Sequence, residues 1–292
     1  MKHSYLRLHV SILLAGATGL FGKFISISEL PLVFYRVVFS AMFLALVMGL
    51  GHRLHRLLGR QLAAILGCGV LLSVHWVCYY GSIKLANVSI GAICFALVGF
   101  FTALVEPLVN HHKPSWRELM LSLITVAGVM LIFGFDTRYR VGIAVGCLSS
   151  LLYSFYSVLS KKVQAVTGRA SSTMLFYELV GGGVVLAVAL FIFSQCRPEA
   201  DVIPSAHDFW ALLIFAAVFT IAPFLLQLQA LRSISAFTVS LSYNLEPIYT
   251  ILLAMLIFGE SRELSGAFWI GVSLILISVL IQTLLAIKAK RV

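Results

Sequence analysis

The chain has 292 residues, of which 61% are hydrophobic and 11% are charged, and its net charge is +10. Soluble domains carry roughly 45–50% apolar and 25% charged residues, so this composition excludes an ordinary soluble protein and predicts an integral membrane protein. The excess of Lys and Arg does not indicate nucleic-acid binding, because most of these residues lie in short loops between apolar runs, where they set membrane topology.

Cysteine and histidine spacing predicts neither a disulfide framework nor a metal site. Four of the five cysteines fall inside apolar runs, and none forms a CxxC pair. The pairs His52/His55 and His111/His112 lie in basic loops with no nearby set of carboxylates or thiolates, which zinc sites require. We therefore expect no metal and no cofactor.

A membrane-crossing helix needs about 20 mostly apolar residues. Ten such runs are present, at about 7–25, 31–50, 61–83, 87–109, 117–135, 141–160, 172–194, 208–230, 234–258 and 265–287. The first run has the outline of a signal peptide. We expect it to be retained, because the internal repeat described below needs it as its first helix.

The distribution of basic residues predicts the orientation. With the N-terminus in the cytoplasm, fourteen Lys and Arg residues fall on inner segments and six on outer ones. This positive-inside bias, together with an even number of spans, predicts that both termini are cytoplasmic, in a membrane such as the bacterial inner membrane. The connectors are too short for a soluble domain.

Two halves of the sequence are related. The triplet FYR at 34–36 aligns with FYE at 176–178, and YYGSIKLANVS at 79–89 aligns with LQLQALRSISA at 226–236. The spacing fits two units of five helices, residues 1–135 and 141–292. An odd number of crossings in each unit turns the second unit upside down, and inverted repeats of this kind are typical of secondary transporters. We predict an all-α membrane protein of ten transmembrane helices in two inverted five-helix repeats.

Several motifs now give a resemblance. They are VFYRVVFSA around Arg36, IKLANVS before the fourth helix, SYNLEPIYTILLAMLIFGES in the ninth, and GAFWIGVSLILISVLI in the tenth. With these residues the chain resembles the drug/metabolite transporter superfamily, in particular the EamA-type ten-helix transporters, over nearly all of 7–287. The resemblance implies a mid-helix proline, Pro247, and a Gly–Glu end to the ninth helix at Gly259 and Glu260. The fourth helix departs from this pattern, since Gly99 stands near the position equivalent to Pro247 and its own proline comes later.

Two ionisable residues lie within apolar runs at opposite ends of the membrane. Arg36 is ~7.5 Å below the outer end of the second helix, and Glu178 lies at a similar depth above the inner end of the seventh. Charges in lipid are costly and usually functional, so each is assigned to one mouth of a central cavity. The alternatives are that Arg36 extends to outer headgroups and that Glu178 pairs with a basic residue at the inner rim, Lys161, Lys162 or Arg169.

Glu246 is the deepest acid, ~17 Å along the ninth helix. Pro247 follows it and cannot donate a backbone hydrogen bond, so a local break is expected, as in the helices that line transport sites. With Tyr243 and Asn244 nearby, Glu246 is a candidate counter-ion for an amino group or a proton carrier, and Arg36 is long enough to approach it. The alternative is a protonated carboxyl bonded to a neighbouring helix.

Aromatic residues of the third helix are further candidates. His75 and Tyr79 share a helical face, and with Trp76 and Tyr80 they are expected to line a substrate cavity unless they serve only in packing. Gln227 is the repeat equivalent of Tyr80 and is assigned to the same cavity.

Two weaker patterns complete the set of candidates. Glu106 precedes Pro107 near the inner end of the fourth helix and is a second candidate for gating or proton coupling. The GxxxG pattern at 142–146 predicts close helix packing, within one chain or in a homodimer.

The sequence thus favours a secondary transporter that works by alternating access. The resemblance implies a small polar metabolite, an amino acid or related amine, moved outward. There is no GxxxxGK[ST] motif, so a proton gradient or downhill flow is expected to drive transport. The alternative is an intramembrane enzyme such as a lipid-linked transferase, which would need grouped acids, whereas Glu106, Glu178 and Glu246 lie on separate helices. A monomer and a homodimer are both compatible with the sequence.

Overall fold

A computed structural model describes residues 2–51, 57, 59–133, 139–258 and 266–288, and over these ranges all regular secondary structure is helical. The helices are α1 Lys2–Gly16, α2 Thr18–Phe24, α3 Glu29–Leu50, α4 Gly59–Leu85, α5 Val88–Phe95, α6 Val98–Asn110, α7 Trp116–Phe133, α8 Arg140–Thr167, α9 Ser171–Cys196, α10 Ala206–Ala217, α11 Ile221–Leu231, α12 Ala236–Ser242, α13 Glu246–Phe258 and α14 Gly266–Lys288. A single 3₁₀ turn, η2 Tyr243–Leu245, joins α12 to α13.

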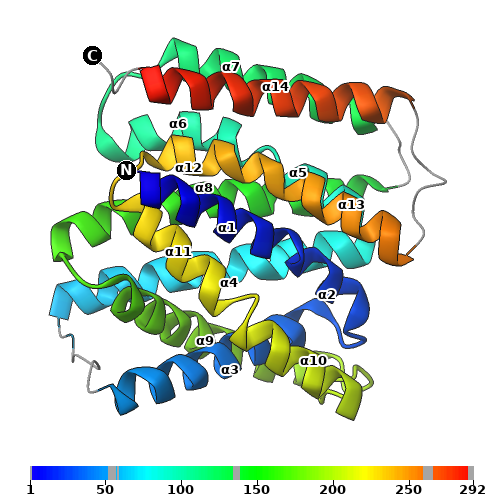
Figure 1. Ribbon diagram of the computed structural model, residues 1–292. Coiled ribbons are helices and arrows are strands. Elements are labelled where there is room, and N and C mark those ends of the chain that lie inside the picture. The colour runs from blue at the N-terminus through cyan, green and yellow to red at the C-terminus, as the bar shows by residue number, and fades with distance from the viewer. Residues whose placement is uncertain (1, 52–56, 58, 134–138, 259–265, 289–292) are drawn as a thin grey trace.

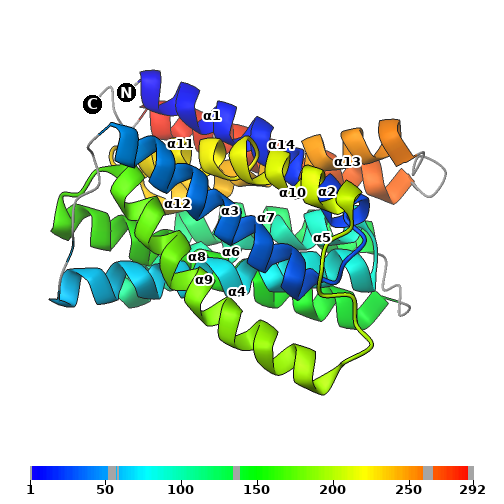
Figure 2. The same cartoon turned by 90° about the horizontal axis from the view of Figure 1, so that it is seen from below.

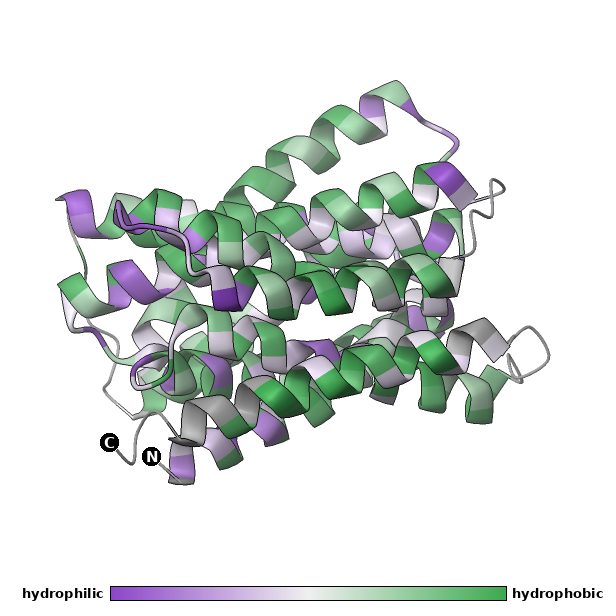
Figure 3. Ribbon diagram, turned by 90° about the horizontal axis from the view of Figure 1, so that it is seen from above, coloured by the Kyte–Doolittle hydropathy of each residue, from purple (hydrophilic) through white to green (hydrophobic). Residues whose placement is uncertain are grey.

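Within the described residues, eight helical stretches are long and apolar enough to cross a bilayer. Four of them are unbroken helices (α3, α4, α8, α9), and the other four each combine two consecutive helices. Large apolar side chains such as Phe191 and Leu256 are 67% and 83% exposed, as expected of a surface that faces lipid. Hydrophilic residues gather toward the helix ends (Figure 3). The protein is therefore an all-α integral membrane protein.

The helices form one bundle of roughly parallel rods, and α1 begins at the same end at which α14 finishes (Figure 1). The view from below shows the same alignment of the rods (Figure 2). Long α4 packs against both α8 and α9, α1 packs against α11 and α13, and α7 pairs with α14 at one edge. Segments far apart in sequence thus surround the middle of α4.

Three of the runs expected to be single helices are interrupted. The run at 7–25 is α1 and α2, the run at 87–109 is α5 and α6, and the run at 208–230 is α10 and α11. The prediction of one continuous helix for each of these runs was wrong. The length of an apolar run indicates a membrane span, but it does not show whether the helix is broken inside that span. The break expected in the run at 234–258 is confirmed at η2.

The break between α5 and α6 contains no proline. The Ala96 and Leu97 amides donate to carbonyls three residues back, Ile93 (3.0 Å) and Cys94 (3.1 Å), instead of four. Serine hydroxyls of α8 then donate to the carbonyls at the break: Ser150 Oγ to Cys94 O (2.7 Å) and Ser154 Oγ to Val98 O (3.0 Å). Polar side chains from a neighbouring helix thus add hydrogen bonds to the carbonyls beside the break, which lipid cannot do.

The break before α13 uses different chemistry. The Glu246 amide donates to Tyr243 O, the shorter bond of a 3₁₀ turn. Pro247 then occupies the first turn of α13, where its lack of an N–H costs nothing because that amide has no intrahelical acceptor. Thr250 Oγ1 donates to Glu246 O (3.1 Å) and to Gly16 O of α1 (2.7 Å). This side-chain hydrogen bond joins the interrupted α12–α13 segment to the interrupted α1–α2 segment.

Glycines bring α8 and α9 close to the first half of the chain. A Cβ at Gly181 would lie 2.6 Å from Leu66 O, and one at Gly69 would lie 1.8 Å from Glu178 O. In the GxxxG pattern, a Cβ at Gly142 or Gly146 would meet Ala86 Cβ at 2.9 Å or Cys94 Cβ at 2.6 Å. The pattern therefore serves close packing inside the chain.

Candidate functional site

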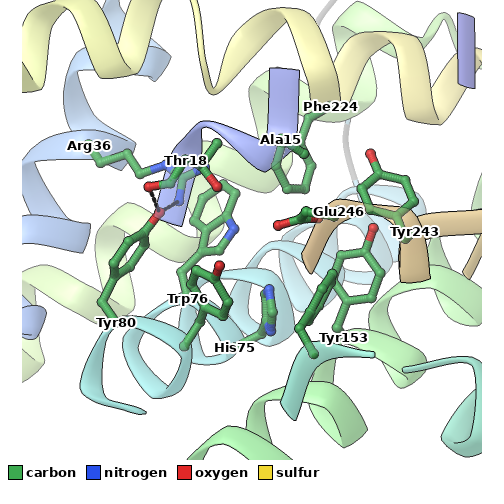
Figure 4. Close-up of a pocket in the computed structure, with 12 residues that line it drawn as sticks. Ala15, Thr18, Arg36, His75, Trp76, Tyr80, Tyr153, Phe224, Tyr243 and Glu246 are labelled. Atoms are coloured by element: carbon green, nitrogen blue, oxygen red, sulfur yellow. Dashed lines mark hydrogen bonds between the residues drawn. The ribbon is translucent and has the colours of Figure 1, made fainter. Parts of the chain in front are cut away.

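A buried cavity lies beside the middle of α4, among the interrupted helices (Figure 4). Its lining residues are Ala15, Thr18, Arg36, His75, Trp76, Tyr79, Tyr80, Phe95, Tyr153, Phe224, Tyr243 and Glu246. The open volume is about 20 Å³, room for about one water molecule. Seven of the residues expected at a substrate site meet here: Arg36, His75, Trp76, Tyr79, Tyr80, Tyr243 and Glu246.

Arg36 points into the bundle and not toward the headgroups. It is 1% exposed, and its guanidinium carbon lies 3.9 Å from the Trp76 ring centre and 4.3 Å from that of Phe215. Its Nε donates to Thr220 Oγ1 (2.8 Å) and its Nη1 to Tyr80 Oη (3.2 Å). Stacking on aromatic faces and these two bonds hold the cation in a fixed position at the cavity wall.

Glu246 is the acid of the cavity. It is the first residue of α13, where the partial positive charge of the helix N-terminus favours an anion. Among the described residues, neither an ion pair nor a hydrogen bond engages its side-chain oxygens, although the residue is only 6% exposed. Its carboxyl and the Arg36 guanidinium enter the cavity from different sides (Figure 4). A buried carboxylate that has no hydrogen-bond partner among the described residues is unusual, and this indicates a role in binding a ligand or a proton.

The remaining walls are aromatic. His75 Nδ1 lies 2.8 Å from Ser149 Oγ and 2.9 Å from Ser149 O, so the ring is bonded and lines the cavity at once. The Tyr79 hydroxyl is buried and has no hydrogen-bond partner among the described residues, whereas the Tyr153 hydroxyl contacts the side chains of Gln227 and Tyr243. Aromatic faces that surround such hydroxyls can bind a cationic group and donate to a polar one.

Tyr243 links the cavity to a polar chain outside it. Its hydroxyl lies 2.6 Å from Ser11 Oγ and donates to Gln227 Oε1 (3.2 Å). Gln227 and Asn244, both expected at the site, do not line the cavity. Asn244 Nδ2 is 3.4 Å from Thr125 Oγ1, on the far side of the break. Pro247 likewise lies behind Glu246 and not in the wall.

The other two candidate acids lie away from the cavity and have partners. Glu178 accepts from Ser160 Oγ (2.5 Å) and Tyr156 Oη (3.3 Å), so hydroxyls of α8 bind its carboxylate. Glu106 Oε2 accepts from the Phe237 amide (3.0 Å) and caps the N-terminus of α12. Both acids therefore stabilise contacts between helices. In this they differ from Glu246, whose carboxyl accepts no hydrogen bond from the described residues.

Five lining residues were not expected from the sequence: Ala15, Thr18, Phe95, Tyr153 and Phe224. Thr18 contributes through its backbone, because the break after Gly16 exposes its carbonyl to Tyr80 Oη (3.2 Å). Phe95 was detectable in principle, since it stands 148 positions before Tyr243 in the repeat. Nothing in the local sequence distinguishes Tyr153 or Phe224 from packing residues.

Comparison with known proteins now adds to the geometry. The model of the EamA-like transporter family matches residues 4–134 and again residues 140–284. The chain belongs to the EamA-like transporter family. This family is part of the drug/metabolite transporter superfamily, which confirms the resemblance seen in the sequence and makes the protein a membrane transporter.

This EamA-like transporter is similar to two curated proteins, each named an uncharacterized transporter. One, from Vibrio cholerae serotype O1, is 25% identical over 244 residues, covering 81% of this chain and 77% of that protein. The other, from Clostridium kluyveri, is 24% identical over 237 residues, covering 78% and 74%. A solved crystal structure of 18% identity superposes with a TM-score of 0.73 over 97% of this chain and 98% of that one, which supports the fold.

The sequence also predicted that no metal is bound. Within the described residues, His, Cys, Asp and Glu do not gather in groups of three or more that would hold an ion. His112 Nδ1 lies 3.0 Å from Lys113 O. The pair His52/His55 and the Gly259–Glu260 end of the ninth helix lie outside the described residues.

Proposed function

We propose that this EamA-like transporter is a secondary transporter that exports a small metabolite with an amino group, an amino acid or related amine, by alternating access. The observation that carries the proposal is that the Glu246 carboxyl, which has no hydrogen-bond partner among the described residues, shares a cavity with the Arg36 guanidinium. The carboxyl is the counter-ion for the amino group. Arg36 binds the carboxylate of an amino acid as a fork of N–H donors.

The cavity walls suit such a ligand. Trp76 lies between the two charged groups and Tyr153 lies on the other side of Glu246, beside Tyr243 (Figure 4), and aromatic faces attract an ammonium group. The Tyr79 hydroxyl, which has no hydrogen-bond partner among the described residues, donates to the ligand. A buried polar site of this kind rejects an analogue without the matching group, because its own polar atoms would then stay unpaired.

The proposal includes ten spans in two inverted repeats, residues 1–135 and 141–292. Helices α6 and α13 are each 13 residues long and begin 148 positions apart, at Val98 and Glu246. Each follows a break, and the two interrupted segments run in opposite directions (Figure 1). The residues before the breaks, Phe95 and Tyr243, both line the cavity. A pair of broken helices in corresponding positions supports a shared site between inverted halves.

The small volume of the cavity supports alternating access. Space for about one water molecule does not admit an amino acid. Binding therefore requires α5–α6 and α12–α13 to separate from α4 at one end, after which the cavity closes again. The excess of basic residues on the inner connectors supports cytoplasmic termini and a location in a bacterial inner membrane.

Coupling to protons is assigned to Glu246. Because the carboxyl is buried and has no partner in the described residues, binding a proton and binding an amine are competing ways to neutralise it. The competing hypothesis of a lipid-linked transferase requires acids grouped at one face, whereas Glu106, Glu178 and Glu246 occupy three separate environments.

Purified protein tests the proposal. Melting temperature is measured with a panel of amino acids and amines, since a ligand that binds only the folded state raises it. Arg36→Gln should abolish the shift caused by amino acids but keep part of the shift caused by amines without a carboxylate. Arg140→Gln, at an exposed helix start, is the matched control. If no member of the panel raises the melting temperature, the assigned substrate class is wrong.

A further inference from the structure

A second cavity opens where α8 and α11 end, away from the substrate site. Its volume is about 290 Å³, and it is lined by Lys161, Gln164, Ala165, Gly168, Leu231 and Arg232. Two of these lining residues are cations and none is acidic. The proposed topology places this end of the bundle in the cytoplasm.

Arg232 is held in place by the cavity wall and keeps free donors. Its Nη2 donates to the backbone carbonyl of Arg169. The Gln164 amide fits best with its oxygen toward Arg232 Nε (3.2 Å) and its nitrogen toward Leu228 O (3.0 Å). Within the part of the chain that the structure describes, no hydrogen bond is formed by the two N–H groups on Arg232 Nη1, and Arg169 Nε is buried without a partner. A preorganised guanidinium with spare N–H donors suits the oxygens of a phosphate.

Two helix C-termini meet at this cavity, and their partial negative charge would repel an anion. At the end of α11, the positive charge of Lys161 offsets this partial negative charge. Its Nζ donates to Ile234 O (2.5 Å) and lies 3.4 Å from Leu231 O. The ammonium group therefore compensates the last carbonyls of α11, and the charge of Arg232 remains for a ligand.

The equivalent cavity at the opposite end differs in this respect. It has a volume of about 320 Å³, and its lining residues include Lys84, which the alignment of 79–89 with 226–236 pairs with Leu231. There Lys84 Nζ donates to Ile25 O (3.1 Å), and Lys23 Nζ lies 4.3 Å from the Phe258 ring centre. The protein itself thus engages both lysines of the outer cavity, whereas the inner cavity has a guanidinium with unused donors.

We propose that the cavity between α8 and α11 binds a phosphate group, supplied by the headgroup of an anionic phospholipid. Cytoplasmic leaflets carry anionic lipids, and basic pockets between transmembrane helices on that side bind their headgroups. Val166, which follows Ala165 on α8, is 77% exposed and offers apolar contact for an acyl chain. The site is separate from the transport cavity, so it stands or falls independently of the proposed substrate.

Native mass spectrometry of the purified protein tests this site. Binding of phosphatidylglycerol and of phosphatidylcholine is titrated for wild type, Arg232→Gln and Lys84→Gln. We expect phosphatidylglycerol to bind more tightly than phosphatidylcholine, and Arg232→Gln to weaken phosphatidylglycerol about tenfold, the effect of losing a charge-assisted contact. Lys84→Gln, in the equivalent outer cavity, should change neither affinity.

Two further measurements remove ambiguity. Ala165→Leu fills the cavity without removing a charge and should also weaken phosphatidylglycerol, so the test survives poor folding of the arginine variant. Inorganic phosphate is titrated alone. Competition with the lipid supports the shared phosphate site, whereas stabilisation by phosphate without any effect of phosphatidylglycerol overturns the lipid as its source. Equal binding of the two lipids, or unchanged binding in both cavity variants, overturns the site.

Discussion

The two interrupted segments α5–α6 and α12–α13 are built alike and carry different chemistry. Their second helices have equal length and begin at Val98 and Glu246, in equivalent positions. The break before α6 is maintained by serines of α8, while the break before α13 is a 3₁₀ turn followed by Pro247. The comparison teaches that a broken helix needs partners for its carbonyls and not a proline. Glu106 of α6 lies two turns beyond the break, so only α13 has an acid as its first residue.

The largest expected effect concerns that acid. Glu246→Gln keeps the shape of the side chain and removes its charge, so transport should fall by at least about 100-fold, as when one partner of a buried charge pair is lost. Uptake or export in proteoliposomes measures it, and an unchanged melting temperature shows that the variant folds. Thr102→Val, one turn beyond Val98 in the segment whose break carries no acid, is the control. Full activity of Glu246→Gln would contradict the assigned role.

The next effect concerns the packing of the proline-free break. A Cβ at Gly99 would lie 2.8 Å from Leu241 Cδ1 and 3.4 Å from Leu241 Cα, so Gly99→Ala displaces the Leu241 side chain and crowds the contact between α6 and α12. Overpacking of this kind costs about 1–3 kcal/mol and should lower the melting temperature by about 2–6 °C. Gly67→Ala is the matched control, because nothing lies within 4 Å of its Cβ position. Equal melting temperatures of the two variants would show that α6 and α12 are not in close contact.

A smaller effect on the free energy of unfolding is expected for the α8 serine hydroxyls that donate to carbonyls beside the break between α5 and α6. Ser154→Ala removes the bond to Val98 O, and the expected loss is about 0.5–1.5 kcal/mol. Thr102 Oγ1 also donates to that carbonyl (2.8 Å), which keeps the loss at the low end. Chemical denaturation in detergent measures it, with Ser273→Ala on the exposed face of α14 as control. A loss above about 3 kcal/mol would mean that the break depends on this serine alone.

The smallest effect is expected at the proline. Pro247→Ala restores an N–H in the first turn of α13, where it is not needed, so stability should change by less than about 1 kcal/mol. Cysteine accessibility at Asn244 and Tyr249, on either side of the turn, reports whether the break persists. If the cysteines are protected as in one continuous helix from α12 into α13, Pro247 is required for the break. The break before α13 would then depend on a proline, unlike the break before α6.

The candidate site was predicted in part. The depth of Arg36 and Glu246 in apolar runs marked them, and both line the cavity. Glu178 and Glu106 were marked by the same rule and lie elsewhere, bound by hydroxyls and by a helix N-terminus. Burial of a charge can be inferred from one sequence, but the identity of its partner cannot, since Ser160 and Phe237 come to these acids from other helices.

By itself, the sequence determined the class and the arrangement along the chain. Apolar runs long enough for lipid predicted an all-helical membrane protein, because backbone groups in lipid must be satisfied internally. The repeated motifs identified the family and the likeness of the two halves, since related local patterns are visible along one dimension. Only the tertiary structure decided where helices are interrupted and which polar groups meet, because those outcomes depend on side chains from distant helices. Tyr153, Phe224 and the carbonyl of Thr18 enter the cavity on that account.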